Sequence, residues 1–123
     1  MKAADAFPVR RVYDPPGEAD GVRVLVDRLW PRGVSKERAA VDEWLKEVTP
    51  SSELRTWFHQ HRDEYEEFGR RYRAELAGQE QQDAVHHLCE LAAAGTVTLV
   101  TAVKDVEHGH LPTLRAVLME ERG

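Results

Sequence analysis

The sequence predicts a single compact α/β domain in which a small, mainly parallel sheet is covered by about five helices. The chain order is the first reason. Two strand-like segments, residues 22–28 and 96–103, flank a long stretch with helical periodicity, and this order favours parallel strands joined by a right-handed crossover. The length of 123 residues suits one domain, and a hydrophobic content of 41% is typical of globular proteins.

Three or four strands are expected. The first candidate is VRRVYD, residues 9–14, and it is followed by a turn rich in proline and glycine. The second is VRVLVDR, residues 22–28, whose valines share one face by alternation. The clearest is TVTLVTAV, residues 96–103, because a β-branched and nearly continuous apolar run is typical of a strand covered on both faces.

Apolar residues at helical spacing predict the helices. They are expected at 41–48, from Pro50 through Phe58 with Thr49 as cap, at about 63–76 before a stop at Gly78, around 85–92 with an end at Gly95, and from a start between His108 and Pro112. A loop is expected from Trp30 to about Arg38, because Pro31 and Gly33 disfavour a helix there.

Composition excludes several classes of protein. A net charge of −5 argues against an extended DNA-binding surface, which usually needs a basic face. No apolar run approaches the roughly 20 residues of a membrane span, so no membrane partner is expected. The first ten residues lack the apolar stretch of a secretory signal, and the single Cys89 cannot form an internal disulfide; the cytoplasm is therefore the expected location. Residues 1–8 are expected to be flexible.

The sequence identifies no cofactor and no metal site. It lacks the C-x-x-C, H-E-x-x-H, P-loop and G-x-G-x-x-G patterns that mark metal and nucleotide sites. Cys89 falls on the apolar stripe of a predicted helix and is interpreted as a small core residue. Apolar positions on the terminal helix would be compatible with a homodimer.

Charged and aromatic residues follow both central strands. The first strand leads into Asp27, Arg28, Trp30, Arg32 and Lys36, and the second leads into Lys104, Asp105, His108 and His110. Ligands of open α/β sheets gather beyond the carboxyl ends of the parallel strands. If the two strands are neighbours, the two groups therefore meet at one rim of the sheet.

Residue type suggests a role for each group. Arg28 and Arg32 would bind a carboxylate or phosphate, with Lys104 in support, since guanidinium presents a planar fork of donors. Trp30 would close one wall. Three further residues are candidates for proton transfer or orientation: Asp27, Asp105 and His108.

Three hypotheses follow. The first is a small-anion site, with or without catalysis, at the carboxyl ends of the strands. The second is a non-catalytic interaction or regulatory module that docks an acidic partner or, locally, nucleic acid. In the third, ion pairs such as Arg28–Asp105 or Asp27–Lys104 merely tie the strand ends together, and Trp30 belongs to the core.

Five segments in this order resemble the YeaO-like proteins, small bacterial proteins within a larger family of unknown function. The segments are RVYDPP, VLVDRLWPRG, DEWLKEVTPSSELRTWF, FGRRYRAEL and TLVTAVKDVEHGH, and the resemblance extends from about Arg11 to about Leu118. It implies an α/β fold and a bacterial cytoplasmic setting. In similar sequences the last segment reads KD-x-x-HNH, so Gly109 replaces an asparagine here, and any ligand contact made by that asparagine would be lost.

Overall fold

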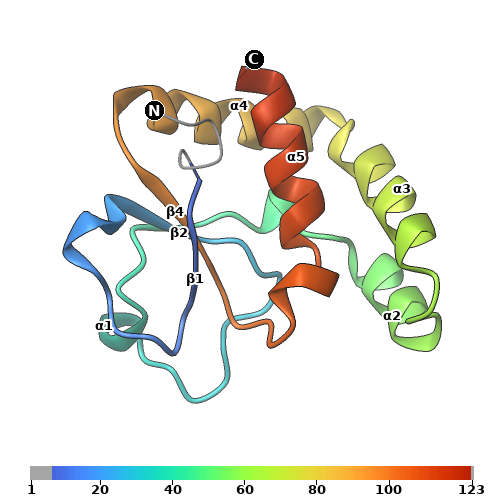
Figure 1. The fold of residues 1–123 in the computed structure, drawn as a ribbon, viewed down its shortest axis with the longest axis horizontal. Coiled ribbons are helices and arrows are strands. Elements are labelled where there is room, and N and C mark those ends of the chain that lie inside the picture. The colour runs from blue at the N-terminus through green and yellow to red at the C-terminus, as the bar shows by residue number, and fades with distance from the viewer. Residues whose placement is uncertain (1–6, 123) are drawn as a thin grey trace.

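A four-stranded parallel sheet forms the centre of the molecule (Figure 1). The structure is a computed structural model and describes residues 7–122. The strands are β1 (Val9–Arg11), β2 (Val22–Leu25), β3 (Glu43–Trp44) and β4 (Val97–Thr101), arranged in the order β1-β4-β2-β3. The parallel pairing of β2 with β4 confirms the arrangement on which the predicted rim depends.

Alternation along the central strands divides the core into two layers. Val24 and Val26 face a large apolar cluster built with the long helices, whereas Leu25 faces a smaller cluster on the other side of the sheet. All five residues of β4 are buried, as expected for a strand covered on both faces. The sheet therefore holds the ends of β2 and β4 rigidly beside each other.

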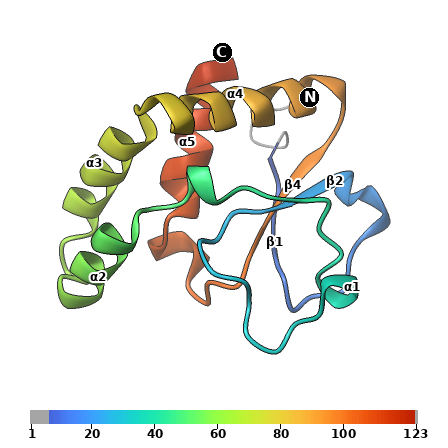
Figure 2. The ribbon, with the colours of Figure 1, turned by 180° about the vertical axis from the view of Figure 1, so that it is seen from behind.

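Four long helices belong to the larger cluster: α2 (Ser52–Gln60), α3 (Tyr65–Leu76), α4 (Gln79–Ala94) and α5 (Leu111–Arg122). The short α1 (Lys36–Ala39) belongs to the smaller cluster, and Figures 1 and 2 show it apart from the other helices. The fold is thus a compact α/β domain, as predicted. No helix among residues 7–122 has both the length and the apolar character needed to cross a bilayer.

The helix predicted at residues 41–48 is wrong. This segment contains β3 and a 3-10 turn, Lys46–Val48. Glu43 and Trp44 pair with the open edge of β2, and the Trp44 indole N–H donates to the Asp27 carbonyl at 2.7 Å. Hydrogen bonding to a strand that needs a neighbour outweighed a short apolar pattern with helical spacing.

Other boundaries differ by a few residues. The three predicted strands are each shorter in the structure, and α1 begins inside the predicted loop at Lys36. Ser51, not Thr49, caps α2, because the Ser51 hydroxyl accepts the Leu54 N–H at 3.1 Å. Of the segment expected to be flexible, residues 1–6 lie outside the described residues, and Phe7 is fully buried in the larger cluster.

Candidate functional site

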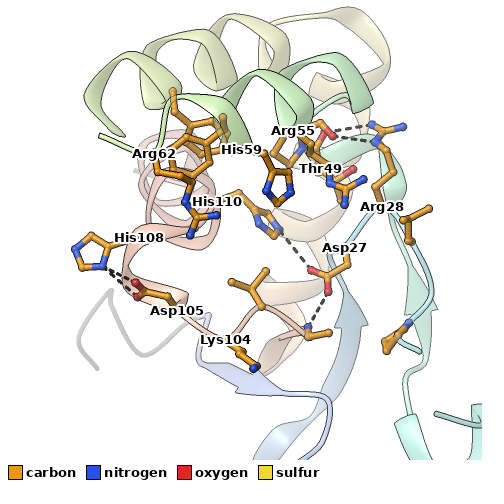
Figure 3. Close-up of a pocket in the computed structure, with 18 of the residues that line it drawn as sticks. Asp27, Arg28, Thr49, Arg55, His59, Arg62, Lys104, Asp105, His108 and His110 are labelled. Atoms are coloured by element: carbon orange, nitrogen blue, oxygen red, sulfur yellow. Dashed lines mark hydrogen bonds and ion pairs between the residues drawn. The ribbon is translucent and has the colours of Figure 1, made fainter. Parts of the chain in front are cut away.

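A cavity of about 590 Å³ opens at the carboxyl ends of β2 and β4 (Figure 3). The chain leaves β2 toward β3 on one side and leaves β4 toward α5 on the other, so a crevice forms between the two strand ends. Its walls come from the loop after β2, from α2 with the turn before it, and from the loop after β4. The volume falls within the range of small-molecule sites.

The residues predicted for the site do converge. This cavity is lined by Asp27, Arg28, Trp30, Arg32, Lys104, Asp105 and His108. Lys36 is not among the lining residues, because the chain has already turned into α1 at that point. Within residues 7–122, neither of the two anticipated ion pairs, Arg28–Asp105 and Asp27–Lys104, forms.

Asp27 forms part of the cavity floor. Its Oδ1 accepts the Thr101 hydroxyl at 2.6 Å, and its Oδ2 accepts the Ala102 N–H at 2.7 Å. The Nε2 atom of His110 lies 3.6 Å from Asp27 Oδ1 and 2.6 Å from the Val26 carbonyl oxygen. Since a carbonyl can only accept, Nε2 carries a proton and donates it to Val26. The Thr101 hydroxyl and the Ala102 N–H therefore hold the Asp27 carboxylate in one orientation.

His110 is the buried histidine of the site. Burial lowers the pKa of His110, and the charge of Arg55 lowers it further; the nearby Asp27 carboxylate and the bond to Val26 oppose this, but the net direction is downward. The imidazole is therefore held toward its neutral form. The sequence grouped His110 with the rim residues but gave it no role.

Arg28 is directed away from the centre of the cavity (Figure 3). Its Nε donates to the Pro50 carbonyl at 2.8 Å, and its Nη2 donates to the carbonyls of Thr49 and Lys46 at 3.3 and 3.4 Å. These bonds tie the 3-10 turn and the start of α2 to the end of β2. Arg28 thus positions one wall of the cavity.

The Trp30 side chain is also held in place by contacts within the fold. Its indole N–H donates to the Val34 carbonyl at 2.6 Å, and its ring meets Trp44 edge to face with centroids 5.4 Å apart. The half-buried ring can therefore offer a ligand only apolar surface. This fits the predicted wall and leaves no indole donor for recognition.

Sequence reasoning missed the cationic side of α2. Arg55, His59 and Arg62 recur at intervals of four and three residues, which places them along one side of the helix and its C-terminal end. Figure 3 shows them along the helical side of the cavity, with Lys104 on the opposite side. The spacing of these cations is a sequence signal for the cationic side, whereas the apolar periodicity alone predicts only the buried side of the helix.

The cavity has the opposite charge to the chain as a whole. Five cationic side chains and two carboxylates line it, a formal charge of +3 with the histidines neutral, whereas the whole chain carries −5. Within the described part of the chain, no ion pair engages Arg32, Arg55, Arg62 or Lys104. A concave surface lined by unpaired cations concentrates positive potential and attracts anions.

Asp105 and His108 form a separate pair at the rim. His108 Nδ1 lies 3.0 Å from Asp105 Oδ2, and both side chains are exposed. The Tyr65 hydroxyl, on α3, donates to the Gly109 carbonyl at 2.9 Å and fixes the loop that carries the pair. The Asp105–His108 pair is thus well placed to meet a ligand but lies in solvent, unlike Asp27.

Among the residues that the structure describes, no group of three or more His, Cys, Asp or Glu side chains is arranged to hold a metal ion.

The chain matches a family model described as "Inactive DUF488-N3 subclade" over residues 6–122. It is 46% identical over 101 residues to the uncharacterized protein YeaO of Escherichia coli (strain K12), covering 82% of this chain and 86% of that protein. It is 41% identical over 110 residues to the uncharacterized protein Rv3073c of Mycobacterium tuberculosis (strain ATCC 25618 / H37Rv), covering 89% and 91% of the two chains. No solved structure matches it.

Proposed function

The chain belongs to the family described as the inactive DUF488-N3 subclade, and we propose that its cavity binds a small anion, a phosphate or carboxylate, without converting it. One observation carries this proposal. Unpaired cations from three separate segments converge on a single cavity in a protein that is acidic overall. Arginine forks suit the planar oxygens of carboxylates and phosphates, and lysine adds a point charge.

The arrangement favours a small ligand over an extended polyanion. Arg55 and Lys104 belong to opposite walls of one recess, whereas a nucleic-acid backbone is usually followed by cations spread over a face. The positive end of α5 adds to the potential, since that helix begins at Leu111, directly after His110. The cavity is also large enough to enclose most of a small organic molecule.

Binding without turnover agrees with the family description and with the surroundings of Asp27. That carboxylate already accepts two hydrogen bonds from the fold, which favours a fixed acceptor over a mobile proton carrier. The predicted roles of Asp105 and His108 in proton transfer are replaced in this proposal by ligand contact at the rim.

Titration calorimetry with sulfate and inorganic phosphate tests the proposal. Arg55→Gln and Arg62→Gln should each weaken binding about tenfold, because a hydrogen bond to a charged group contributes about 1.5–3 kcal/mol. Arg38→Gln is the matched control, since Arg38 is an exposed arginine outside the cavity. Equal affinities of the Arg55→Gln/Arg62→Gln double variant and the wild type would refute an anion site here.

A further inference from the structure

We infer that the ligand is a phosphate ester with a hydroxyl or ammonium group a few bonds from its phosphate, and that Asp27 accepts a hydrogen bond from this group. The inference rests on the proposed function, since it assigns the chemical class of the ligand to the same cavity. It makes Asp27 a specificity-determining residue in place of the acid or base that the sequence suggested.

The first step concerns the charge of the anion. Four cations line the cavity without an acidic partner among residues 7–122: Arg32, Arg55, Arg62 and Lys104. A carboxylate carries one negative charge, whereas a phosphate monoester carries nearly two at neutral pH and offers three acceptor oxygens. The number of unpaired cations therefore matches a phosphate better than a carboxylate.

The second step concerns the carboxylate on the floor. Asp27 is a negative charge on the floor of a cavity whose formal charge is +3, so it repels the anion that the cations attract. Both hydrogen-bond donors that the fold gives this carboxylate, the Thr101 hydroxyl and the Ala102 N–H, are neutral. Among residues 7–122, no arginine or lysine forms an ion pair with Asp27. The negative charge of Asp27 therefore suits a ligand group that donates a hydrogen bond to it.

The third step concerns what the floor can offer. Each oxygen of Asp27 accepts one hydrogen bond from the fold, while a carboxylate has about four acceptor positions. The neighbouring Val26 carbonyl already accepts from His110. The Asp27 carboxylate thus has acceptor positions left for a ligand. A hydroxyl or ammonium group of the ligand can donate to them, so that no polar group is left unsatisfied.

The cation and the carboxylate that would bind the two ends of the ligand lie near each other. Asp27 Oδ1 lies 3.6 Å from His110 Nε2, and the charge of Arg55 also acts on this imidazole, since burial and this charge both lower the pKa of His110. A cation that binds phosphate and a carboxylate that binds a donor therefore flank the same imidazole. Figure 3 shows all three side chains around one part of the cavity. A ligand that reaches both needs only a short link between phosphate and donor.

A matched series of probes tests this with the wild-type protein: ethyl phosphate, hydroxyethyl phosphate and aminoethyl phosphate, measured by titration calorimetry at one pH. We expect hydroxyethyl and aminoethyl phosphate to bind at least about tenfold more tightly than ethyl phosphate, since each adds a hydrogen bond to a charged acceptor. The hydroxyl compound separates hydrogen bonding from the extra positive charge of the amine. In Asp27→Asn the preference should fall at least about fivefold, because a neutral amide oxygen is a weaker acceptor than a carboxylate, while ethyl phosphate binds at least as well as to the wild type.

The outcomes distinguish the two proposals. If the three esters bind equally and sulfate binding still depends on Arg55 and Arg62, the cavity is an anion site and the inference about Asp27 is wrong. If neither sulfate nor any phosphate binds, the inference fails; if acetate does not bind either, the proposed function fails with it. If the preference exists but is unchanged in Asp27→Asn, the donor is recognised elsewhere and the assignment to Asp27 is overturned.

Discussion

Replacing Arg28 with alanine separates a structural arginine from a ligand-binding one. The sequence paired Arg28 with Arg32 as anion ligands, but the two side chains have different surroundings in the structure. Arg28 donates to three backbone carbonyls, whereas Arg32 is exposed at the cavity rim. We therefore expect Arg28→Ala to lower the free energy of unfolding and Arg32→Ala to leave it almost unchanged.

The magnitude follows from the three bonds. The 2.8 Å bond from Nε to Pro50 has good length and is partly buried, and such a bond from a charged donor contributes about 1.5 kcal/mol or more. The two bonds from Nη2, at 3.3 and 3.4 Å, share one nitrogen and are longer, so together they add less than one full bond. We expect a total loss of about 2 kcal/mol for Arg28→Ala. Removal of the exposed Arg32 should change stability by less than about 0.5 kcal/mol.

Urea denaturation followed by circular dichroism measures both changes, and thermal unfolding provides a second readout. A loss of 2 kcal/mol in a domain of this size corresponds to a decrease in Tm of roughly 6–10 °C. Equal stabilities of Arg28→Ala and Arg32→Ala would contradict this account of Arg28. So would a stable Arg28→Ala variant that loses sulfate binding, because Arg28 would then be a ligand contact.

Three further substitutions test the fold, one at the start of β2 and two beside the cavity. Arg23→Met should lower the free energy of unfolding by about 3–5 kcal/mol in urea denaturation, because it removes the closer cation of the buried Asp20 carboxylate and leaves only Arg10, at 3.9 Å; a loss below about 1 kcal/mol would contradict this. In the wild type, burial raises the pKa of Asp20, but its bonds to the Gly17 N–H and Arg23 lower it overall, so the associated stability is complete above about pH 4 and is lost as the pH falls further, which acid titration of Tm can follow. The lowered pKa of His110 has a similar consequence at higher pH: the unfolded chain takes up the proton more readily below about pH 6.5, so Tm should fall from pH 7 toward pH 5, and less so in His110→Gln. Gly109→Asn should cost no more than about 1.5 kcal/mol in thermal unfolding, since its Cβ would lie 3.1 Å from a Val103 methyl and 3.3 Å from the Asp105 carbonyl oxygen, contacts that small shifts can relieve, and the backbone φ of −104° suits any residue; a much larger loss would show that glycine is required.

The central strands could be predicted because their signal is local. Apolar β-branched runs specify β2 and β4, and strands separated by helices pair in parallel, so the rim with Asp27 and Lys104 followed from chain order alone. The position of the cavity at this rim is a property of the fold class. This is why residues more than seventy positions apart could be assigned to one site from the sequence.

Features that depend on tertiary contacts could not be predicted. The segment around Trp44 has a helical apolar pattern, but the open edge of β2 made it a strand. The three carbonyls that Arg28 binds are brought together only when the 3-10 turn packs beside β2. The contribution of Arg55 depends on how α2 is rotated about its axis, which is set by the packing of Leu54 and Phe58 in the core.

Several arginines outside the cavity form ion pairs with acidic side chains. Arg71 donates to Glu67, and Arg73 donates to Glu120 across α3 and α5. Arg55 and Arg62 have no such partner among residues 7–122, although the sequence contains 22 acidic residues. Arg62 lies over the Phe58 ring, 5.1 Å from its centroid, but like charges gathered in one recess still repel each other and destabilise the folded state. Residues that violate a rule of folding without an evident local gain are expected at functional sites, which supports the proposed anion site.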